Sequence, residues 1–283
     1  MAEDETARAA RRIAFQGERG AYGEEAVVAY FGKQVVPVPQ KSFAEVARAV
    51  TRGETGGGLL PIENSQAGSI NEAYDLLRTG NLCLIGEICL PVNHCLLCLP
   101  GQTLHQIKRV LSHPQALAQC DAYLRELGVE VVAAYDTAGS ARLIREEELY
   151  GVAAIASARA AELYQLDILE HSIQTVRENY TRFVVLGRKP VPPPKEGAKT
   201  MLLLATNHQP GALHQVLGEF ATRGINLLKL ESRPSREKPW EYVFYLDIEG
   251  SPEQAPVAQA LAGLAGKTTF VQVLGTFPRA PGF

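Results

Sequence analysis

Residues 189–197 read Lys-Pro-Val-Pro-Pro-Pro-Lys-Glu-Gly, and this stretch divides the chain into two parts. Four prolines in nine residues favour an extended, semi-rigid spacer, because proline fixes φ and removes a backbone donor. The chain of 283 residues is also longer than the ~100–200 residues of a typical domain. We therefore expect a disordered tail at 1–12, one domain at 13–189, a linker at 190–198 and a second domain at 199–283.

The part after the linker shows elements in the order strand, helix, strand, strand, helix, strand. Pro210 is tolerated in a first helical turn, and Gly224 lies where that helix should end. This order predicts a ferredoxin-like βαββαβ module, whose pattern contains no catalytic constellation and suggests binding or regulation. We expect its strands at 201–205, 227–231, 242–248 and 269–274, and its second helix at 257–264.

The part before the linker alternates short apolar strands with amphipathic helices, so we expect an α/β fold whose largely parallel sheet is covered by helices. About 180 residues could form one sheet or two smaller lobes with a cleft between them. We expect strands at 12–16, 35–38, 59–62, 109–111, 129–133, 152–156 and 181–186, and helices at 24–31, 42–52, 70–77, 116–127 and 138–147.

The charge balance excludes several classes of partner. The formal net charge is −3, so no basic field predicts binding to nucleic acid or to acidic lipid. The chain holds no apolar run near the ~18 residues that span a membrane. The first twelve residues lack the apolar centre of a secretion signal. We therefore expect a cytoplasmic protein with no membrane partner.

Four cysteines, Cys83, Cys89, Cys95 and Cys98, lie within sixteen residues. A zinc site needs thiolates that converge at a tight turn, whereas this stretch predicts two strands that meet near Pro91. Side chains three residues apart on a strand point to opposite faces, so two of these thiols should diverge. We interpret all five cysteines of the chain as buried and reduced, and we predict no metal site.

Polar clusters follow the predicted strands, where open α/β sheets place their ligands. Each also has a structural explanation, because the first could be a turn with an asparagine cap and the last could fill a strand edge. The glycine-rich turn at 17–20 lacks the GxGxxG spacing of a dinucleotide site, so we predict no cofactor. The clusters are Pro61-Ile62-Glu63-Asn64-Ser65, Ser112-His113-Pro114-Gln115 with Gln119, and Asn179-Tyr180-Thr181-Arg182-Phe183.

Taken together, the clusters resemble prephenate dehydratase with a C-terminal ACT regulatory domain. The motifs are GxxGAY from Gly17, PIENS from Pro61, SHPQALAQC from Ser112, YDTAGSA from Tyr135, NYTRF from Asn179, PGAL from Pro210 and LESRP from Leu230. The resemblance runs from about Ile13 to about Pro278 and implies a two-lobed, periplasmic-binding-protein-like catalytic domain. Members usually carry serine where this chain has Gly23, and often aspartate where it has Asn207.

The resemblance implies dehydration and decarboxylation of prephenate to phenylpyruvate in L-phenylalanine biosynthesis, with no cofactor. The expected catalytic residues are Thr181, Glu63 and Asn64, and the expected substrate-binding residues are Ser65, Ser112, Gln119, Ser157, Arg182 and Phe183. Thr181 would help the 4-hydroxyl to leave, while Glu63 would hold its loop or, with a raised pKa, act as an acid. Arg182 could instead be an internal strut paired with an acid, because successive strand residues face opposite ways.

L-Phenylalanine is the expected effector of the ACT module, which would join copies of the chain into a homodimer or homotetramer. The expected effector-binding residues are Gly211, Ala212, Leu213, Glu231, Ser232, Arg233 and Pro234. The module could instead serve only to hold the oligomer together. Two other functions stay open from the sequence: arogenate dehydratase on the same scaffold, and a non-catalytic two-lobed protein that binds an anion.

Overall fold

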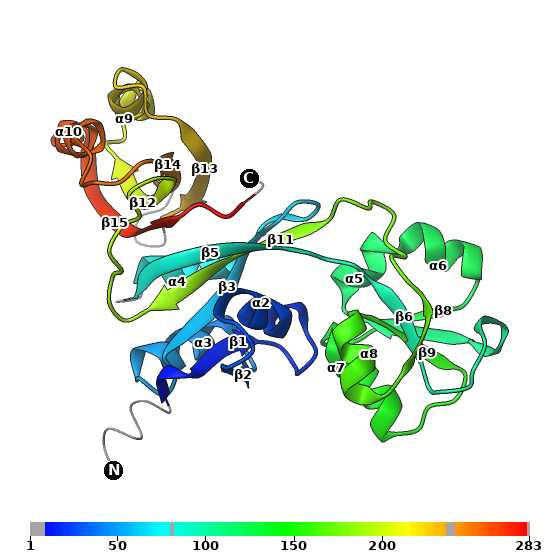
Figure 1. The fold of residues 1–283 in the computed structure, drawn as a ribbon. Coiled ribbons are helices and arrows are strands. Elements are labelled where there is room, and N and C mark those ends of the chain that lie inside the picture. The colour runs from blue at the N-terminus through cyan, green and yellow to red at the C-terminus, as the bar shows by residue number, and fades with distance from the viewer. Residues whose placement is uncertain (1–8, 80–81, 236–240, 282–283) are drawn as a thin grey trace, which may run out of the picture. The chain divides into compact units, whose positions relative to one another are not determined.

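The structure, a computed structural model, describes residues 9–79, 82–235 and 241–281 (Figure 1). Its contacts divide the chain into one unit of Met1–Leu76 and Ile88–Phe183 and a second of Leu77–Glu87 and Val184–Phe283. Strands β5 (Cys83–Pro91) and β11 (Tyr180–Gly187) therefore each continue from one unit into the other. The division falls ahead of the proline-rich linker, and it assigns a segment of the first predicted domain to the C-terminal unit.

The first unit contains two sheets, as the two-lobed alternative predicts. The first sheet has the order β2-β1-β3-β11-β5, with β4 paired to β3, and β1 pairs in parallel with both of its neighbours. Helix α3 packs on β1 and β3, and α2 on the same two strands. The elements are β1 (Arg12–Gln16), α2 (Tyr22–Phe31), β2 (Val36–Gln40), α3 (Phe43–Thr51), β3 (Gly57–Asn64), β4 (Gly68–Ser69) and α4 (Asn71–Thr79).

The second sheet has the order β10-β6-β9-β7-β8, in which β7 is parallel to β8 and β9 while β6 is antiparallel to β9. Its core contains Leu96, Val110, Leu117 and Ile155. The elements are β6 (Cys95–Cys98), a 3-10 turn (Leu104–Gln106), β7 (Arg109–Ser112), α5 (Pro114–Gln119), α6 (Asp121–Leu127), β8 (Glu130–Ala133), α7 (Thr137–Glu146), β9 (Val152–Ala156), α8 (Ala158–Tyr164) and β10 (Asp167–Glu170).

The predicted helix 116–127 is wrong in one respect, because it is two helices that break at Cys120. The backbone of Cys120 is not helical, with φ −105° and ψ 14°. The carbonyl of Gln119 accepts a hydrogen bond from Thr175 N at 2.8 Å, and Thr175 belongs to neither of the two helices. A contact with a distant segment therefore ends α5, and no local pattern could indicate it.

The N-terminal tail is ordered earlier than predicted. Arg12 opens β1, the carbonyl of Arg11 accepts from Val36 N at 2.8 Å, and that of Arg12 accepts from Gly56 N at 2.8 Å. Residues 1–8 of the predicted tail lie outside the described residues.

The ACT-like sequence of the C-terminal unit folds as the predicted βαββαβ module. Its four-stranded antiparallel sheet has the order β13-β14-β12-β15, with Leu204, Phe220 and Leu246 in the core beneath its helices. Gly211 precedes the first helix with φ 79°, a left-handed conformation that favours glycine. The elements are β12 (Ala198–Thr206), α9 (Ala212–Ala221), β13 (Leu227–Pro234), β14 (Tyr242–Glu249), α10 (Ala255–Gly263) and β15 (Thr268–Pro278).

The five cysteines lie in the described residues and form no disulfide. Cys95, Cys98 and Cys120 are buried as predicted, whereas Cys83 and Cys89 are only half-buried. Burial raises the pKa of Cys98 to about 11 and that of Cys120 to about 12. Both thiols are therefore protonated at neutral pH and act as small apolar side chains. Within the described ranges, histidine, cysteine and acidic residues form no group that could hold a metal ion.

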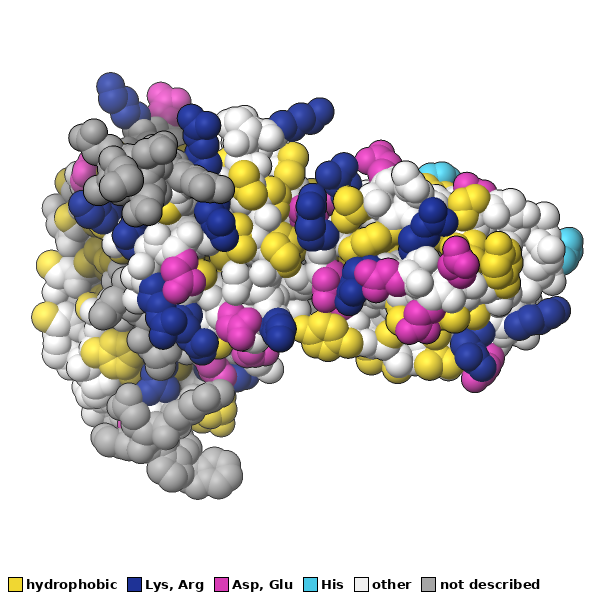
Figure 2. All heavy atoms as spheres, turned by 90° about the horizontal axis from the view of Figure 1, so that it is seen from below, with side chains coloured by type: hydrophobic (Ala, Val, Ile, Leu, Met, Phe, Trp, Pro, Cys, Tyr) yellow, Lys and Arg dark blue, Asp and Glu magenta, His cyan; other side chains and the backbone are white. Residues whose placement is uncertain are grey.

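The surface charge is mixed, as the composition predicts. Figure 2 shows basic and acidic side chains interspersed over the face in view, and its described residues form no continuous basic area there. No helix in the described part of the chain is long and apolar enough to cross a bilayer.

A buried ion cluster joins β5 to the ACT sheet inside the C-terminal unit. Lys199 Nζ lies 2.9 Å from Glu87 Oε2 and 3.1 Å from Asp247 Oδ2, and the two carboxylate side chains are 1% exposed. Glu87 Oε1 also accepts from Ala280 N at 3.0 Å. Because two acids share this lysine, the cluster depends on the lysine charge.

We expect Lys199→Met to lower the free energy of unfolding by about 3–5 kcal/mol, because two buried carboxylates lose a cation. Urea unfolding followed by circular dichroism measures the change. The matched control is Arg279→Met, which removes the half-exposed ion pair with Glu249 at 3.0 Å and should cost about 0–1 kcal/mol. Equal costs for the two variants would contradict the cluster's importance.

Candidate active site

A cavity of about 520 Å³ in the first unit is lined by residues from the elements of both sheets. Asn64 at the end of β3, and Thr181 and Phe183 at the start of β11, come from the first sheet. Gln119 lies at the end of α5, which follows strand β7 of the second sheet, and His94 lies just before strand β6 of the same sheet. The cavity therefore brings together side chains that are far apart in the sequence.

Asn64 is the centre of a buried hydrogen-bond network. The main-chain N–H groups of Gln66 and Ala67 donate to Asn64 Oδ1 over 3.1 and 2.9 Å. These donors establish which end of the amide is oxygen, so Nδ2 is directed to β11 and the residue before it. The two hydrogens of Nδ2 are shared among three acceptors, which are Asn179 Oδ1 at 2.8 Å, Thr181 Oγ1 at 3.0 Å and Tyr180 O at 3.1 Å.

The Thr181 hydroxyl is oriented by this contact. A threonine hydroxyl has one proton and two lone pairs. One lone pair of the Thr181 oxygen accepts a hydrogen bond from Asn64 Nδ2, so the hydroxyl proton of Thr181 is left to be donated to another acceptor. Thr181 is 9% exposed and lines the cavity, so a molecule in the cavity is a possible acceptor.

The network continues through Gln119 to the opposite wall. Gln119 Nε2 donates to Asn64 Oδ1 at 3.3 Å, and Gln119 Oε1 accepts from Asn179 Nδ2 at 3.1 Å. His94 Nε2 lies 2.8 Å from Gln119 Oε1, and His94 Nδ1 lies 3.1 Å from the Tyr22 hydroxyl. Burial lowers the pKa of His94.

Charged side chains are few around the cavity. Lys41 is the exposed lysine of the lining, and Glu72 and Asp136 are its acids. Asp136 caps α7, where its Oδ1 accepts from Gly139 N at 2.7 Å, and burial raises its pKa. An anion in this cavity would therefore meet mainly neutral amide and hydroxyl donors.

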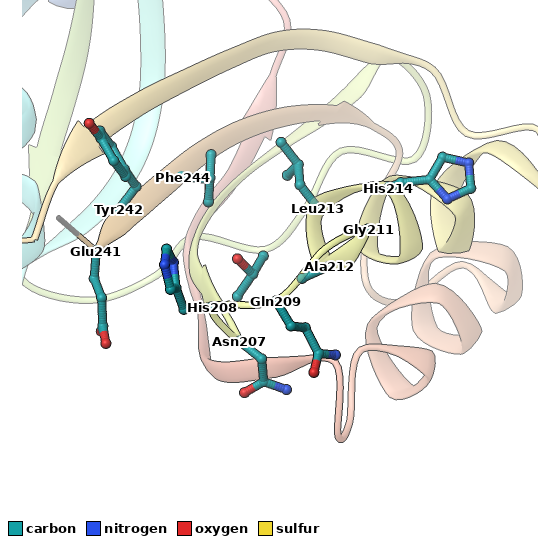
Figure 3. Close-up of a pocket in the computed structure, with 11 residues that line it drawn as sticks. Asn207, His208, Gln209, Gly211, Ala212, Leu213, His214, Glu241, Tyr242 and Phe244 are labelled. Atoms are coloured by element: carbon teal, nitrogen blue, oxygen red, sulfur yellow. The ribbon is translucent and has the colours of Figure 1, made fainter.

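A second cavity of about 370 Å³ lies at the start of α9 in the C-terminal unit. Gly211, Ala212 and Leu213 line it, together with residues of the preceding loop and of β14. Figure 3 shows Leu213, Phe244 and His208 around one space, with His214 directed away from it. Small residues at the helix start leave room for an apolar side chain.

Comparison with known proteins assigns both parts of the chain. Residues 13–191 match the family model of prephenate dehydratase, and residues 200–266 match that of the ACT domain. The chain belongs to the prephenate dehydratase family.

Individual relatives agree with this assignment. An arogenate dehydratase/prephenate dehydratase of Arabidopsis thaliana, described as chloroplastic, is 44% identical over 285 residues, which cover 94% of this chain and 68% of that protein. A bifunctional N-acyl-homoserine lactone acylase/prephenate dehydratase of Komagataeibacter europaeus is 39% identical over 277 residues, covering 96% and 97%. The structure of a prephenate dehydratase from Arthrobacter aurescens in complex with L-Phe is 31% identical, with a TM-score of 0.86 over 95% of this chain and 90% of that one.

The family motifs contribute unequally to the first cavity. Of the site residues predicted from sequence, Asn64, Gln119, Thr181 and Phe183 line it. Five others are not in its lining: Glu63, Ser65, Ser112, Ser157 and Arg182.

Three predicted serines are engaged elsewhere. The hydroxyl of Ser112 donates to Ile155 O, and that of Ser157 donates to Gly20 O, each at 2.7 Å. Ser157 also caps α8 by accepting from Ala160 N. Ser65 Oγ accepts from Tyr180 N at 2.9 Å.

Arg182 and Glu63 form an ion pair, with Nη1 and Oε2 3.6 Å apart. Thr181 lines the cavity while Arg182 does not, as the alternation of side chains along a strand predicts. The pair favours the strut interpretation of Arg182 and the loop-holding interpretation of Glu63.

Sequence analysis assigned no role to Tyr22 and His94, although both line the cavity. Tyr22 lies in the GxxGAY motif, which was a usable signal. His94 lies in the cysteine-rich stretch, where no local pattern marks it as a site residue. Gly23 lines the cavity too, and a Cβ there would lie 3.1 Å from Gln16 O, so a serine requires a small shift of its neighbours.

The predicted effector residues are also divided. Gly211, Ala212 and Leu213 line the second cavity, whereas Glu231, Ser232, Arg233 and Pro234 do not. Those four lie on β13, where Ser232 pairs with Phe244 and Pro234 with Tyr242 of β14. They therefore flank the strand that supplies one wall of the cavity.

We expect Asn64→Asp to destabilise the protein by about 1–3 kcal/mol, because a carboxylate would face acceptors where the amide donates. Thermal unfolding measures the change. The control Asn226→Asp, at an exposed position, should stay within about 0.5 kcal/mol of the wild type. A neutral effect at Asn64 would mean that its network does not hold the site.

Proposed function

We propose that the protein is a prephenate dehydratase, which forms phenylpyruvate, carbon dioxide and water. The bond to the ring carboxylate breaks as carbon dioxide leaves, and its electron pair moves across the ring to expel the 4-hydroxyl. The prephenate dianion and one proton together give the phenylpyruvate anion, carbon dioxide and water. The departing hydroxide must therefore acquire a proton, and the enzyme must place a donor beside it.

The Asn64–Thr181 hydrogen bond is the observation that carries this proposal. Because the Thr181 hydroxyl accepts from Asn64 Nδ2 at 3.0 Å, its own proton remains for the leaving oxygen. Threonine is a weak acid, so it can help only when neighbours orient it and the site excludes water. Thr181 meets the first condition, and its low exposure favours the second.

Neutral donors would hold the substrate carboxylates. Gln119 uses one N–H on Asn64 Oδ1, and its second N–H remains for a carboxylate. Lys41 in the cavity lining adds a positive charge. The roles expected for Ser112 and Ser157 have less support, because their hydroxyl protons are given to main-chain carbonyls.

We expect Thr181→Ala to lower kcat for prephenate by about 10²–10³, the usual cost of losing a transition-state donor. Thr181→Ser, which keeps a hydroxyl, should retain most turnover. Phenylpyruvate absorbance measures the rate, and the control Thr51→Ala, on an exposed helix end, should be unchanged. Near-normal turnover in Thr181→Ala would remove this role.

Arogenate is the alternative substrate, with an amino group in place of the keto group of prephenate. Glu72 and Asp136 line the cavity and have the chemistry that an ammonium group favours. Parallel assays with the two compounds measure the preference. Turnover of neither would support the non-catalytic anion-binding alternative.

We also propose that L-phenylalanine binds the second cavity and inhibits the enzyme. The cavity combines the N-terminal end of α9, where main-chain N–H groups have no acceptor within the helix, with the apolar side chains Leu213 and Phe244. The ACT domain and the L-Phe complex of a relative support this proposal. Inhibition requires the ligand to prefer one state of the protein.

We expect Ala212→Leu to weaken inhibition by phenylalanine at least tenfold while basal turnover stays normal, because the larger side chain occupies the cavity. Ala221→Leu is the matched control, since Ala221 lies exposed at the other end of α9. Inhibition curves for the three proteins measure the effect. Equal inhibition of Ala212→Leu and the control would place the effector elsewhere.

The proposal has two further parts. The chain forms a homodimer or homotetramer through its ACT module, and the protein is cytoplasmic. Strand β15 is an edge of the ACT sheet and exposes Phe270, Val271 and Val273 by 39%, 41% and 44%. An exposed apolar edge strand is suited to pairing with a second copy. Sedimentation of the purified chain measures the oligomeric state.

A further inference from the structure

His94 is a buried histidine whose two ring nitrogens are both engaged. It is 2% exposed, with Nε2 2.8 Å from Gln119 Oε1 and Nδ1 3.1 Å from the Tyr22 hydroxyl. The rings of Tyr22 and His94 meet edge to face, with centroids 5.6 Å apart. The backbone N–H of His94 donates to Gln174 Oε1 at 3.0 Å, which holds the residue in place.

The proton on this ring can be assigned from the main chain outward. Gln66 N and Ala67 N make Asn64 Oδ1 an acceptor, so the atom of Gln119 beside it must be the Nε2 donor. Gln119 Oε1 then faces His94, and His94 Nε2 must carry a hydrogen.

The other ring nitrogen of His94 lies beside Tyr22. The Tyr22 hydroxyl donates its single proton to Asn93 O at 2.7 Å, and its oxygen lies 3.1 Å from His94 Nδ1. The hydrogen on His94 Nε2 is therefore assigned from the Gln119 contact alone. Burial lowers the pKa of His94, which favours the neutral form at pH 7.

The orientation of Gln119 matters because its two ends have opposite polarity. With Oε1 held by His94, the second N–H on Nε2 is left as a donor toward the cavity. A reversed amide would present oxygen to an anionic substrate and would also oppose Asn64 Oδ1. Asn179 Nδ2 also donates to Gln119 Oε1 at 3.1 Å and so supports the same orientation of Gln119. The Asn179 side chain is itself held by Asn64, whose Nδ2 donates to Asn179 Oδ1.

We propose that His94 is a positioning residue for substrate binding, whose Nε2–H holds the Gln119 amide so that an N–H group meets a substrate carboxylate. This proposal rests on the proposed function for its effect on turnover. His94 acts through Gln119 and takes no part in proton transfer to the leaving hydroxyl.

Paired variants test the proposal in the full-length protein. His94→Leu removes the donor and should raise KM for prephenate about tenfold with a smaller change in kcat, the value of one neutral hydrogen bond, about 1.4 kcal/mol. His94→Gln can place an amide N–H near the same point and should stay within about threefold of the wild type. Equal losses in both variants, at matched melting temperatures, would overturn the proposal.

A double-mutant cycle separates positioning from packing. If His94 acts through Gln119, then His94→Leu should have no further effect on KM in a Gln119→Leu background. Multiplied losses would show that His94 acts independently and would overturn the proposal.

Nitrogen-15 NMR of histidine-labelled protein gives a readout that needs no turnover. The His94 signals, assigned by their absence from His94→Gln, should show at pH 7 a proton on Nε2 and none on Nδ1. A proton on Nδ1 alone would overturn the proposal. A wild-type chain without dehydratase activity would overturn the proposed function, while the NMR result would still decide the orientation of Gln119.

Discussion

Two main-chain N–H groups, those of Gln66 and Ala67, hold the oxygen of Asn64 and thereby orient the amides of Asn64 and Gln119 in the first cavity. Once this oxygen is an acceptor, the Asn64 nitrogen must donate to β11 and Gln119 must donate back to Asn64. Along this chain of hydrogen bonds, from Asn64 to Gln119 and then to His94, each donor or acceptor role follows from the role of the group before it. A turn after β3 therefore determines hydrogen bonds on the opposite wall of the cavity.

This arrangement fits the proposed substrate, which carries two negative charges. A buried cation would need a permanent counter-charge before substrate binds, because isolated charges are costly to bury. Amide and hydroxyl donors need no counter-charge, because they are neutral. The arginine beside Thr181 is instead paired with Glu63 outside the cavity lining. Gln119 and Thr181, oriented by Asn64, can thus supply directed donors at little desolvation cost.

The C-terminal unit depends on a different interaction, the buried cluster of Lys199, Glu87 and Asp247. Glu87 belongs to β5, and the same chain continues after Pro91 to Val92 and His94 of the first cavity. The ACT module and the first unit are therefore connected along the chain by β5 as well as by the proline-rich linker. A truncation at the linker would leave Glu87 without its lysine, and so a single substitution is the cleaner test of regulation.

The sequence by itself determined the βαββαβ module and the burial of Cys95, Cys98 and Cys120, and its motifs singled out Asn64, Gln119 and Thr181, because apolar periodicity and motif order are local properties. It also predicted that Thr181 and Arg182 face opposite ways, since strand alternation is local too. Only the tertiary structure decided that α5 ends at Gln119, that Ser112 and Ser157 bond to main-chain carbonyls, and that Tyr22 and His94 line the cavity. These features depend on hydrogen bonds between segments tens to more than a hundred residues apart, whose distances and directions no local pattern contains.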